Sequence, residues 1–282
     1  MRSYSDTIFA LATSKTKSAL SVFRVSGKRS IKLTKILFSR KNTRNKTPTV
    51  GYFLDNKKNK IDQVVMTVYK SPKSYTGEDM VEITTHGSNA VIKKITNVLS
   101  KIKNLRMADP GEFTRRAFEN NKLDLTQVEA IADIINAETE MQRKQGIDHL
   151  SGSFFSSSKK IFESLKKILA NVEATIDFSE EDLPKNILKT TKEQTKNNIK
   201  KIDTILSGAK HGLSIREGYV VGVIGRPNTG KSSFINNISG KEIAIVTNKP
   251  GTTRDVLESY IDMDGYPIRF MDTAGIRKSK NL

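Results

Sequence analysis

The sequence has no cysteine among its 282 residues. This absence excludes disulfides, thiolate metal sites and cysteine nucleophiles, and it is compatible with a reducing cytoplasm. No apolar run approaches the roughly 20 residues of a membrane-spanning helix, and the N-terminal segment lacks the long apolar core of a signal peptide. We therefore expect a cytoplasmic protein that does not enter a membrane.

Acidic residues are scarce, because 30 Asp and Glu stand against 48 Lys and Arg, a net charge of +18. Such a charge attracts nucleic acid or another anionic surface. A lysine-rich genomic bias gives the same composition, and the lysines are scattered without a recognised nucleic-acid motif. The charge favours an RNA partner and leaves the compositional bias open.

A phosphate-binding loop is the most informative stretch. Residues 225–232 match G-x-x-x-x-G-K-[ST], in which backbone N–H groups wrap phosphates. In this pattern Lys231 reaches the β- and γ-phosphates and the Ser232 hydroxyl holds Mg²⁺. An apolar, β-branched run at 219–225 precedes the loop, and a helix start at 232–238 follows it, which is the strand–loop–helix order that the motif needs.

Motifs downstream narrow the class of nucleotide-binding protein. A threonine-containing loop at 251–255 can close over the metal, and Asp272-Thr-Ala-Gly275 follows a predicted strand. Between them, residues 256–271 predict a hairpin with an Asp264-Gly265 turn. This order is typical of a GTPase. No N-K-x-D motif follows Asp272–Gly275, where GTPases place their guanine-reading element, so the preference for guanine rests on the order of the switch motifs.

The catalytic loop lacks the glutamine that orients water in Ras-like switches, because Ile276 follows Asp-Thr-Ala-Gly. Charge that develops on the γ-phosphoryl group still needs a positive partner. Arg254 and Arg277 are candidates, although exposed arginines are usually solvated. The side-chain carbonyl of Asn228 can hold a monovalent cation beside the phosphates, or it can simply favour the turn.

The pattern of apolar residues predicts a multidomain α+β and α/β fold. An α+β domain is expected at 1–120, a helical domain at 121–217 and the first part of an α/β domain at 218–282. In the first, strands are predicted at 7–12, 20–25, 50–54, 61–69 and 80–85, with a helix at 91–102. In the second, a Thr126–Glu129 capping box and helices at 154–176 and 186–211 are predicted.

Motifs along essentially the whole chain resemble the bacterial tRNA-modification GTPase family MnmE, also called TrmE. The most diagnostic is Pro110-Gly-Glu-Phe-Thr-Arg-Arg-Ala-Phe118. The others, besides the phosphate loop and Asp-Thr-Ala-Gly, are the segments 6–13, 20–27, 74–79, 122–125, 129–133 and 251–255. The resemblance implies an N-terminal folate-binding domain that also forms a homodimer, and a helical domain into which a P-loop GTPase domain is inserted.

The resemblance also implies an activity and partners. The family acts with a flavin-dependent (FAD) partner, MnmG or GidA, on the wobble uridine of certain tRNAs. Together they install an aminomethyl-type group, such as carboxymethylaminomethyl, at C5, with a one-carbon unit from a formyl-tetrahydrofolate. GTP hydrolysis in the family requires K⁺ and the close approach of two GTPase domains.

Three positions match the family's 5-formyl-tetrahydrofolate site: Arg24, Glu82 and Lys122. The two cations suit anionic folate groups, and Glu82 can accept hydrogen bonds from the pterin amino groups. Taken without the resemblance, each would be interpreted as part of a surface ion pair.

The resemblance implies a GTP site built from three stretches of this chain, namely Asn228, Thr229, Gly230, Lys231, Ser232, Ser233, then Thr247, Asn248, Lys249, Pro250, Gly251, Thr252, Thr253, then Asp272, Thr273, Ala274 and Gly275. Lys231, Thr253 and Asp272 match catalytic positions, and Ser232 and Thr253 match the Mg²⁺ ligands. The K⁺ ligands match Asn228, Thr247, Lys249 and Thr252, with Lys249 acting through its backbone carbonyl because ammonium repels K⁺. K⁺ would then supply the charge that an arginine supplies elsewhere.

Two further expectations concern departures from the family pattern. His86-Gly87-Ser88 stands where the family has H-G-G, which reduces backbone freedom after Gly87. If Leu282 is the natural end, the GTPase domain is a three-stranded remnant with unpaired apolar edges, and we expect no GTP hydrolysis by this chain alone.

Three interpretations of function follow. The first is a K⁺-dependent GTPase component of tRNA uridine modification. The second is a non-enzymatic folate-binding dimerisation scaffold with a vestigial GTPase. The third, a GTPase of ribosome assembly, is disfavoured because it does not account for residues 1–210.

Overall fold

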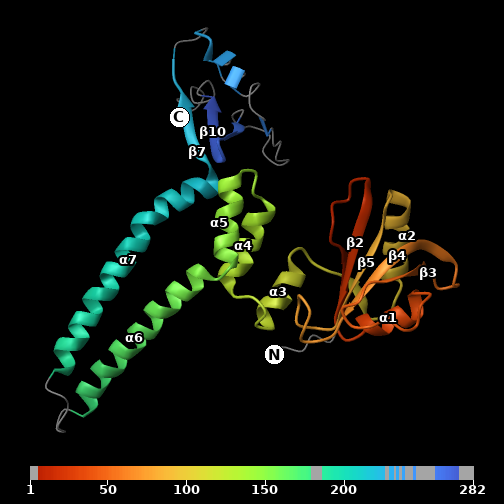
Figure 1. Ribbon diagram of the computed structural model, residues 1–282, viewed down its shortest axis with the longest axis horizontal. Helices are drawn as coiled ribbons and strands as arrows, with labels where there is room; N and C mark the ends of the chain where they lie inside the picture. The colour runs from red at the N-terminus through yellow and green to blue at the C-terminus, as the bar shows by residue number, and fades with distance from the viewer. Residues whose placement is uncertain are drawn as a thin grey trace, which may run out of the picture. The chain divides into compact units, whose positions relative to one another are not determined.

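The computed structural model of this chain describes residues 6–178, 186–225, 229–231, 233–234, 237–238, 244–245 and 258–272. The chain divides into two compact units, residues 1–128 and 129–282, whose elements are drawn in Figure 1. The three-domain division expected from the sequence stays a prediction. The observed architecture mixes α and β structure in both units.

A six-stranded sheet forms the first unit, in the order β3-β4-β5-β2-β1-β6. Only β1 and β6 pair in parallel among these strands, and the other neighbours are antiparallel. The strands are β1 (Thr7–Leu11), β2 (Ser18–Ser26), β3 (Thr49–Leu54), β4 (Lys60–Tyr69), β5 (Met80–Gly87) and β6 (Leu105–Met107). The five predicted strands are confirmed to within two residues at each end. The three-residue β6 is too short to show an alternating pattern and was not predicted.

Helices α1 (Ser30–Leu37) and α2 (Asn89–Ser100) bury their apolar residues in one core with the sheet. Leu33 and Leu37 of α1 and Ile95 of α2 join Phe23 and Phe53 of the strands in this cluster. Because side chains alternate along a strand, every second strand residue is left on the opposite face of the sheet. The predicted helix at 91–102 is confirmed with a start two residues earlier, whereas α1 was not predicted.

Ser88 has a structural role that a glycine at this position would not provide. Its Oγ accepts a hydrogen bond from Val91 N at 3.2 Å, which makes it the N-cap of α2. Serine at this position satisfies one of the free N–H groups at a helix start. The departure from H-G-G therefore stabilises α2.

The start of α4 (Leu125–Ile135) corrects one prediction. The expected Thr126–Glu129 capping box is wrong, because the reciprocal pair is formed by Asp124 and Gln127. Gln127 N donates to Asp124 Oδ1 at 2.9 Å and Asp124 N donates to Gln127 Oε1 at 3.0 Å. Aspartate is a stronger N-cap than threonine, so the helix begins earlier than the serine/threonine pattern suggested.

Helices α5 (Glu140–Leu150), α6 (Ser153–Asp177) and α7 (Ile187–Glu217) follow in the second unit. The α6–α7 hairpin is the long pair at the lower left of Figure 1. Helix α6 confirms the prediction at 154–176. Helix α7 runs six residues beyond its predicted end and stops at Gly218, whose φ of 90° ends the helix.

The C-terminal end of α7 is tied to the preceding helices by polar contacts. Arg216 forms an ion pair of 2.9 Å with Asp133 of α4. Gln145 Nε2 of α5 donates to Gly212 O at 3.1 Å. Helix α5 was not predicted, because its polar sequence shows no apolar stripe. It is held by these contacts and begins with a Thr139–Gln142 capping box.

A second sheet follows α7, in the order β7-β10-β9-β8. Its strands are β7 (Tyr219–Val223), β8 (Ala244–Ile245), β9 (Glu258–Met263) and β10 (Tyr266–Asp272). The expected three-stranded remnant is therefore wrong, since two-residue β8 adds a fourth strand that is too short to predict. The hairpin is confirmed, and the positive φ values of Asp264 (49°) and Gly265 (86°) are those of the expected tight turn.

Candidate functional site

An arginine and a glutamate pair across the middle of the six-stranded sheet. Arg24 on β2 is directly opposite Glu82 on β5, and its Nη2 and Nε donate to Glu82 Oε1 at 2.7 and 3.0 Å. Their neighbours Phe23 and Val25 are buried in the core, so the pair lies on the face away from α1 and α2. Both side chains are one-quarter exposed, which leaves the pair accessible to a ligand.

Aromatic side chains surround this pair. The Arg24 guanidinium carbon lies 4.8 Å from the ring centre of Tyr75 and 5.7 Å from that of Phe113. Tyr69 Oη donates to Glu82 Oε2 at 3.3 Å, and burial, followed by the Glu82 charge, raises the pKa of Tyr69. The site therefore offers one cation, one carboxylate and three phenyl or phenol rings.

Phe113 is positioned by the most diagnostic motif of the sequence. It lies on α3 (Glu112–Glu119), which begins after Gly111 with a φ of 73°. On the same helix Thr114 Oγ1 shares a hydrogen bond of 2.9 Å with Tyr75 Oη. The helix thereby holds both aromatic rings against Arg24.

A buried ionic network anchors α3. Arg116 is completely buried and contacts Glu112, Glu78 and Asp6 at 2.9, 3.2 and 2.9 Å. Glu112 also accepts two hydrogen bonds from Arg106, at 2.7 and 2.8 Å. Burial opposes ionisation of Glu112, but these hydrogen bonds and charges outweigh it and hold its pKa at about 2. Glu112 and Arg116 of the motif are therefore structural, and Phe113 and Thr114 face the site.

Lys122 lies near the same loop without a described contact to Arg24 or Glu82. Its stem packs beside Gly77, where an added Cβ would lie 3.2 Å from Lys122 Cγ. Gly77 belongs to the 74–79 segment that also carries Tyr75. The structure thus brings Arg24 and Glu82 into contact and places Lys122 on the neighbouring loop.

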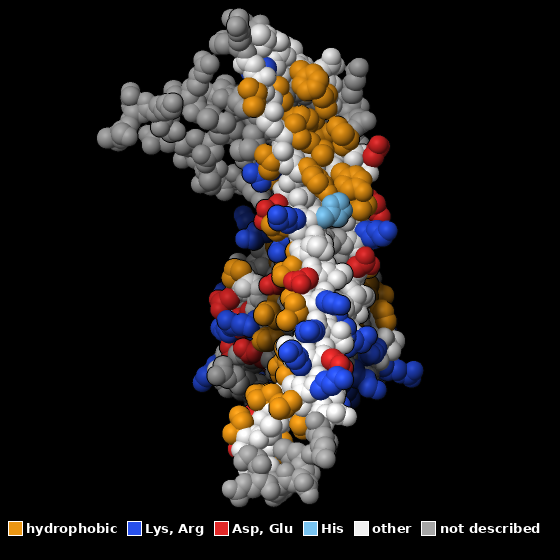
Figure 2. Space-filling view, turned by 90° about the vertical axis from the view of Figure 1, so that its left-hand side faces the viewer, with side chains coloured by type: hydrophobic (Ala, Val, Ile, Leu, Met, Phe, Trp, Pro, Cys, Tyr) orange, Lys and Arg blue, Asp and Glu red, His pale blue; other side chains and the backbone are white. Residues whose placement is uncertain are grey.

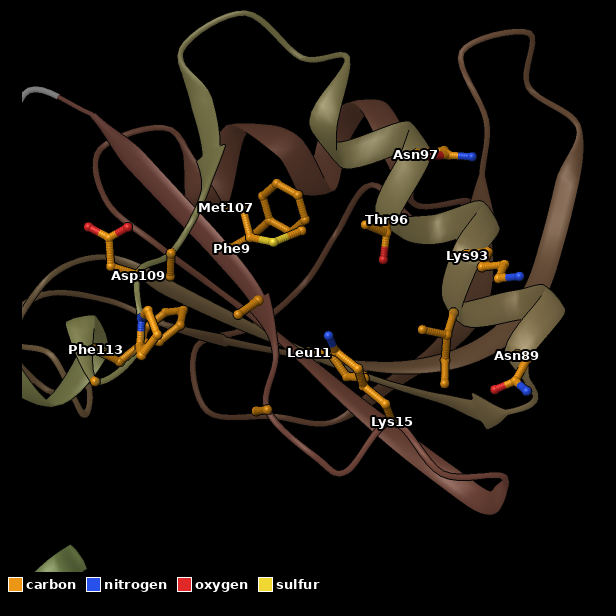
Figure 3. A pocket seen from close by; sticks show the side chains of 16 residues that line it. Phe9, Leu11, Lys15, Asn89, Lys93, Thr96, Asn97, Met107, Asp109 and Phe113 are labelled. Carbon is orange, nitrogen blue, oxygen red and sulfur yellow. The ribbon is translucent and has the colours of Figure 1, made fainter. Parts of the chain in front are cut away.

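A cavity of about 780 Å³ borders Phe113. Figure 3 shows Phe113 and Asp109 at one end, and Asn89 and Lys93 of α2 at the other. Its volume is in the range of small-molecule sites, and its lining is mainly apolar with a few polar groups. Lys15 adds a second cation to the lining.

Strands β7 and β10 of the second sheet lead into the two predicted nucleotide-binding motifs. β7 and β10 are parallel, with Val223 opposite Asp272. The carboxyl ends of parallel strands share one edge of the sheet. The strands that precede the phosphate loop and the Asp272–Gly275 motif therefore end side by side. For Asp272 this statement concerns the backbone, since its side chain is outside the described part.

Several residues of the phosphate loop are described. Gly230 has a φ of 82°, in the region that favours glycine. Lys231 Nζ donates to Gly225 O at 3.0 Å, so the lysine side chain folds over the loop. Thr229 Oγ1 would lie 3.2 Å from a Cβ added at Gly225, and Ser233 is helical and exposed.

The remaining predicted nucleotide and metal ligands lie outside the described residues. They are Asn228, Ser232, Thr247, Asn248, Lys249, Pro250, Gly251, Thr252, Thr253, Thr273, Ala274 and Gly275, and the same holds for the candidate cations Arg254 and Arg277. The predicted Mg²⁺ and K⁺ ligands thus stay predictions. Within the described ranges, no group of three or more His, Cys, Asp or Glu side chains could hold a metal.

Sequence reasoning missed the aromatic part of the first site. Tyr69, Tyr75, Phe113 and Thr114 were not singled out, although Tyr75 and Phe113 lie within the quoted motifs. A signal was present, because aromatic residues within a loop and a short polar helix have no core to fill.

None of the described helices is both long and apolar enough to cross a bilayer.

Comparison with known proteins identifies the family of the chain. Residues 7–122 match the family model of the GTP-binding protein TrmE N-terminus, and residues 125–276 match that of the MnmE helical domain. The chain belongs to the MnmE family, since the second match alone covers more than half of it.

Relatives with reviewed names extend the comparison along the chain. The chain is 46% identical over 276 residues to the tRNA modification GTPase MnmE of Pelagibacter ubique, and 43% over 277 residues to that of Rickettsia bellii. In both cases the match covers 98% of this chain and 62% of the relative. The protein of the same name from Dinoroseobacter shibae is 41% identical over 276 residues, which is 98% of this chain and 64% of that relative. The chain thus spans somewhat less than two thirds of the length of these relatives.

Proposed function

We propose that this chain is part of a GTP-hydrolysing protein that modifies C5 of the wobble uridine of certain tRNAs. One observation carries the proposal. The two family matches follow each other from residue 7 to 276, and the relatives that match 98% of the chain are named tRNA modification GTPases. The proposed product is a carboxymethylaminomethyl-type uridine, with the one-carbon unit taken from a folate.

The 5-formyl-tetrahydrofolate, or a related one-carbon folate, is proposed to bind at the Arg24–Glu82 pair. The donor set fits such a ligand, because Arg24 and Lys122 suit its carboxylates and Glu82 suits its amino groups. The rings of Tyr75 and Phe113 suit an aromatic heterocycle.

GTP is proposed to bind at the carboxyl edge of the β7–β10 pair, within a partial P-loop GTPase domain. The parallel register and the fold of Lys231 over Gly225 support this placement. Ser232 and Thr253 would hold Mg²⁺, and Asn228, Thr247, Lys249 and Thr252 would hold K⁺. When bound, these ions supply positive charge at the γ-phosphate. Lys231 would neutralise the phosphates, and Asp272 would position the metal.

Partners and location are proposed with the function. We propose a homodimer, an FAD-containing MnmG-type partner, and tRNA as the substrate, in the cytoplasm. Membership of the family supports each of these.

The central experiment is nucleoside analysis of tRNA by mass spectrometry after deletion of the gene that encodes this chain. We expect loss of the C5-modified wobble uridine and its return when the gene is restored. Unchanged wobble uridine in the deletion strain would contradict the proposed function.

A second measurement addresses the potassium site. The whole protein is expected to hydrolyse GTP faster in K⁺ than in Na⁺, and Asn228→Ala should remove the difference. Equal rates in the two salts would overturn the K⁺ assignment. The alternative, a folate-binding scaffold with a vestigial GTPase, is favoured if the protein binds folate through Arg24 but hydrolyses no GTP in either salt.

A further inference from the structure

The positive charge is unevenly distributed between the two units. Residues 1–128 contain 25 Lys and Arg but only 10 Asp and Glu, whereas residues 129–282 contain 23 and 20. The first unit therefore has a net charge of +15 and the second +3. The lysines themselves are spread evenly, with 17 in each unit, so the asymmetry comes mainly from the acidic residues, which are half as numerous in the first unit.

Half of the ten acidic residues of the first unit are paired with arginines or a histidine. Glu82 pairs with Arg24, and Asp62 pairs with His86. The buried Arg116 network contains three more carboxylates: Asp6, Glu78 and Glu112. Across residues 6–128 no ion pair of the structure involves a lysine. The lysine charges are therefore uncompensated at the surface.

These charges concentrate over the helices that cover the sheet. We define the α1–α2 lysine face as Arg29, Lys32, Lys35, Lys57, Lys58, Lys94, Lys101 and Lys103, all of which are exposed. Lys32 and Lys35 lie one turn apart on α1. Lys94 and Lys101 are two turns apart along α2 and its end, which places them on one side of that helix.

Hydrogen bonds join the elements of this face. Arg29, at the start of α1, donates to Lys103 O at 3.1 Å. At the other end of α1, Lys58 Nζ of the β3–β4 turn donates to Ile36 O at 2.7 Å. The lysine face thus runs from the β3–β4 turn along α1 to the segment that follows α2.

Carboxylates close to this face are already engaged. Asp55 Oδ1 accepts from Lys57 N and Asn59 N at 2.9 and 2.8 Å. Asp79, whose backbone contacts the start of α1, accepts from Ser71 N at 3.0 Å through its side chain. These hydrogen bonds shape the turns, and the eight cations of the face outnumber the two carboxylates, which leaves an excess of positive charge for an external anion.

The chemistry of the face favours a phosphate backbone over a lipid surface. Peripheral membrane binding combines basic residues with a row of apolar side chains that enter the bilayer. On α1, α2 and the β3–β4 turn, Ile36 is the only large apolar side chain that the structure shows as exposed. A phosphate backbone, in contrast, can be bound by cations alone when they are spaced over an extended surface.

We propose that the α1–α2 lysine face binds the sugar–phosphate backbone of tRNA. This inference rests on the proposed function, which makes tRNA the substrate. The face lies across the sheet from the Arg24–Glu82 pair, so backbone binding here would not compete with the folate site. Such contacts hold and orient the RNA and carry no sequence information by themselves.

The test compares two charge-reversal variants of the full chain. K32E/K35E/K94E alters the lysine face, and K159E/K160E/K167E makes the same change of charge on exposed lysines of α6. Basic side chains also lie along the α6–α7 hairpin, mixed with acidic and hydrophobic ones (Figure 2), so the second variant is a matched control. Affinity for fluorescein-labelled tRNA is measured by anisotropy over a range of salt concentrations.

We expect the lysine-face variant to bind tRNA at least about tenfold more weakly and the control to stay within about twofold. The plot of log affinity against log salt should become shallower by roughly 0.9 for each lost phosphate contact, or about 3 in total. The milder K32Q/K35Q/K94Q variant should show the same direction, and circular dichroism checks that each variant is folded.

Several results would overturn the proposal. Equal losses in the two reversal variants would mean that only net charge matters. Unchanged tRNA binding, with lost binding to phosphatidylglycerol vesicles, would assign the face to a membrane. Failure of the proposed function is seen separately, because wobble uridine in the deletion strain is measured without reference to these lysines.

Discussion

The surroundings of the Arg24–Glu82 pair decide whether it is interpreted as an ordinary surface ion pair or as part of a binding site. A solvent-exposed ion pair contributes little to stability. Here the pair is central in a sheet, three-quarters buried, and flanked by the rings of Tyr75 and Phe113. Burying a cation and an anion in this place costs desolvation energy. A ligand that binds both groups would explain why the pair is kept there.

Arg24→Ala is therefore expected to weaken 5-formyl-tetrahydrofolate binding by about ten- to a hundredfold, since a hydrogen bond to a charged group contributes roughly 1.5–3 kcal/mol. Isothermal titration calorimetry measures the change. Arg115→Ala is the matched control, because Arg115 is exposed on the same helix as Phe113. Equal affinities of the Arg24 variant and the wild type would show that the pair is structural.

At the same scale, Glu112 makes stability depend on pH. Its pKa is lowered from 4.5 to about 2 in the folded protein, so it contributes stability above pH about 4.5 that is lost as pH falls towards 2. The contribution is roughly 3 kcal/mol. Urea unfolding between pH 5 and 2.5 should show a steeper decline for the wild type than for Glu112→Gln. Parallel declines would contradict the assignment.

At the scale of elements, two helical glycines have opposite surroundings. A Cβ at Gly146 of α5 would lie 2.6 Å from Ile134 Cγ1 and 3.3 Å from Ile134 N, whereas a Cβ at Gly208 of α7 would meet nothing within 4 Å. Alanine favours a helix over glycine by about 1 kcal/mol at either site. Only at Gly146 does overpacking oppose that gain.

Gly146→Ala should lower the free energy of unfolding by about 1 kcal/mol or more, and Gly208→Ala should raise it by up to about 1 kcal/mol. Thermal unfolding followed by circular dichroism compares the two. A stabilised Gly146 variant would mean that α4 and α5 separate at little cost.

At the scale of the whole molecule, the two units differ in how their elements are supported. The sheet of the first unit encloses a cluster of completely buried residues. In contrast, α6 has no buried residue among its 25. Its contacts with α7 include polar pairs such as Asn198 Nδ2 to Ser164 Oγ at 2.9 Å and Asn171 Nδ2 to Thr191 Oγ1 at 3.2 Å.

Hydrogen exchange measured by mass spectrometry should therefore be faster in α6 than in β2 and β5, by several orders of magnitude. Helices derive most of their stability from burial of an apolar face, and regions with few buried contacts open most easily. Equal protection of α6 and the central strands would indicate that α6 is covered in solution.

Much of the fold followed from local patterns. The alternation of β2 and β5, the apolar spacing of α2 and the Asp264-Gly265 turn are properties of neighbouring residues, and each prediction was confirmed. Helices α1 and α5 escaped prediction because their stability depends on contacts made by other segments. The capping of α4 was misassigned because two overlapping patterns competed for one helix start.

The sequence by itself determined the family motifs, the phosphate loop, the excess of cations and the positions of the main strands, because these depend on residue type and short spacing. Only the tertiary structure decided which residues meet. It set Arg24 opposite Glu82 from residues 58 positions apart, placed Phe113 beside them, and put Val223 in register with Asp272. It also separated the arginines that form ion pairs, of which Arg116 is buried, from the lysines that remain exposed. Pairing between distant segments depends on packing of the whole core, which no local pattern contains.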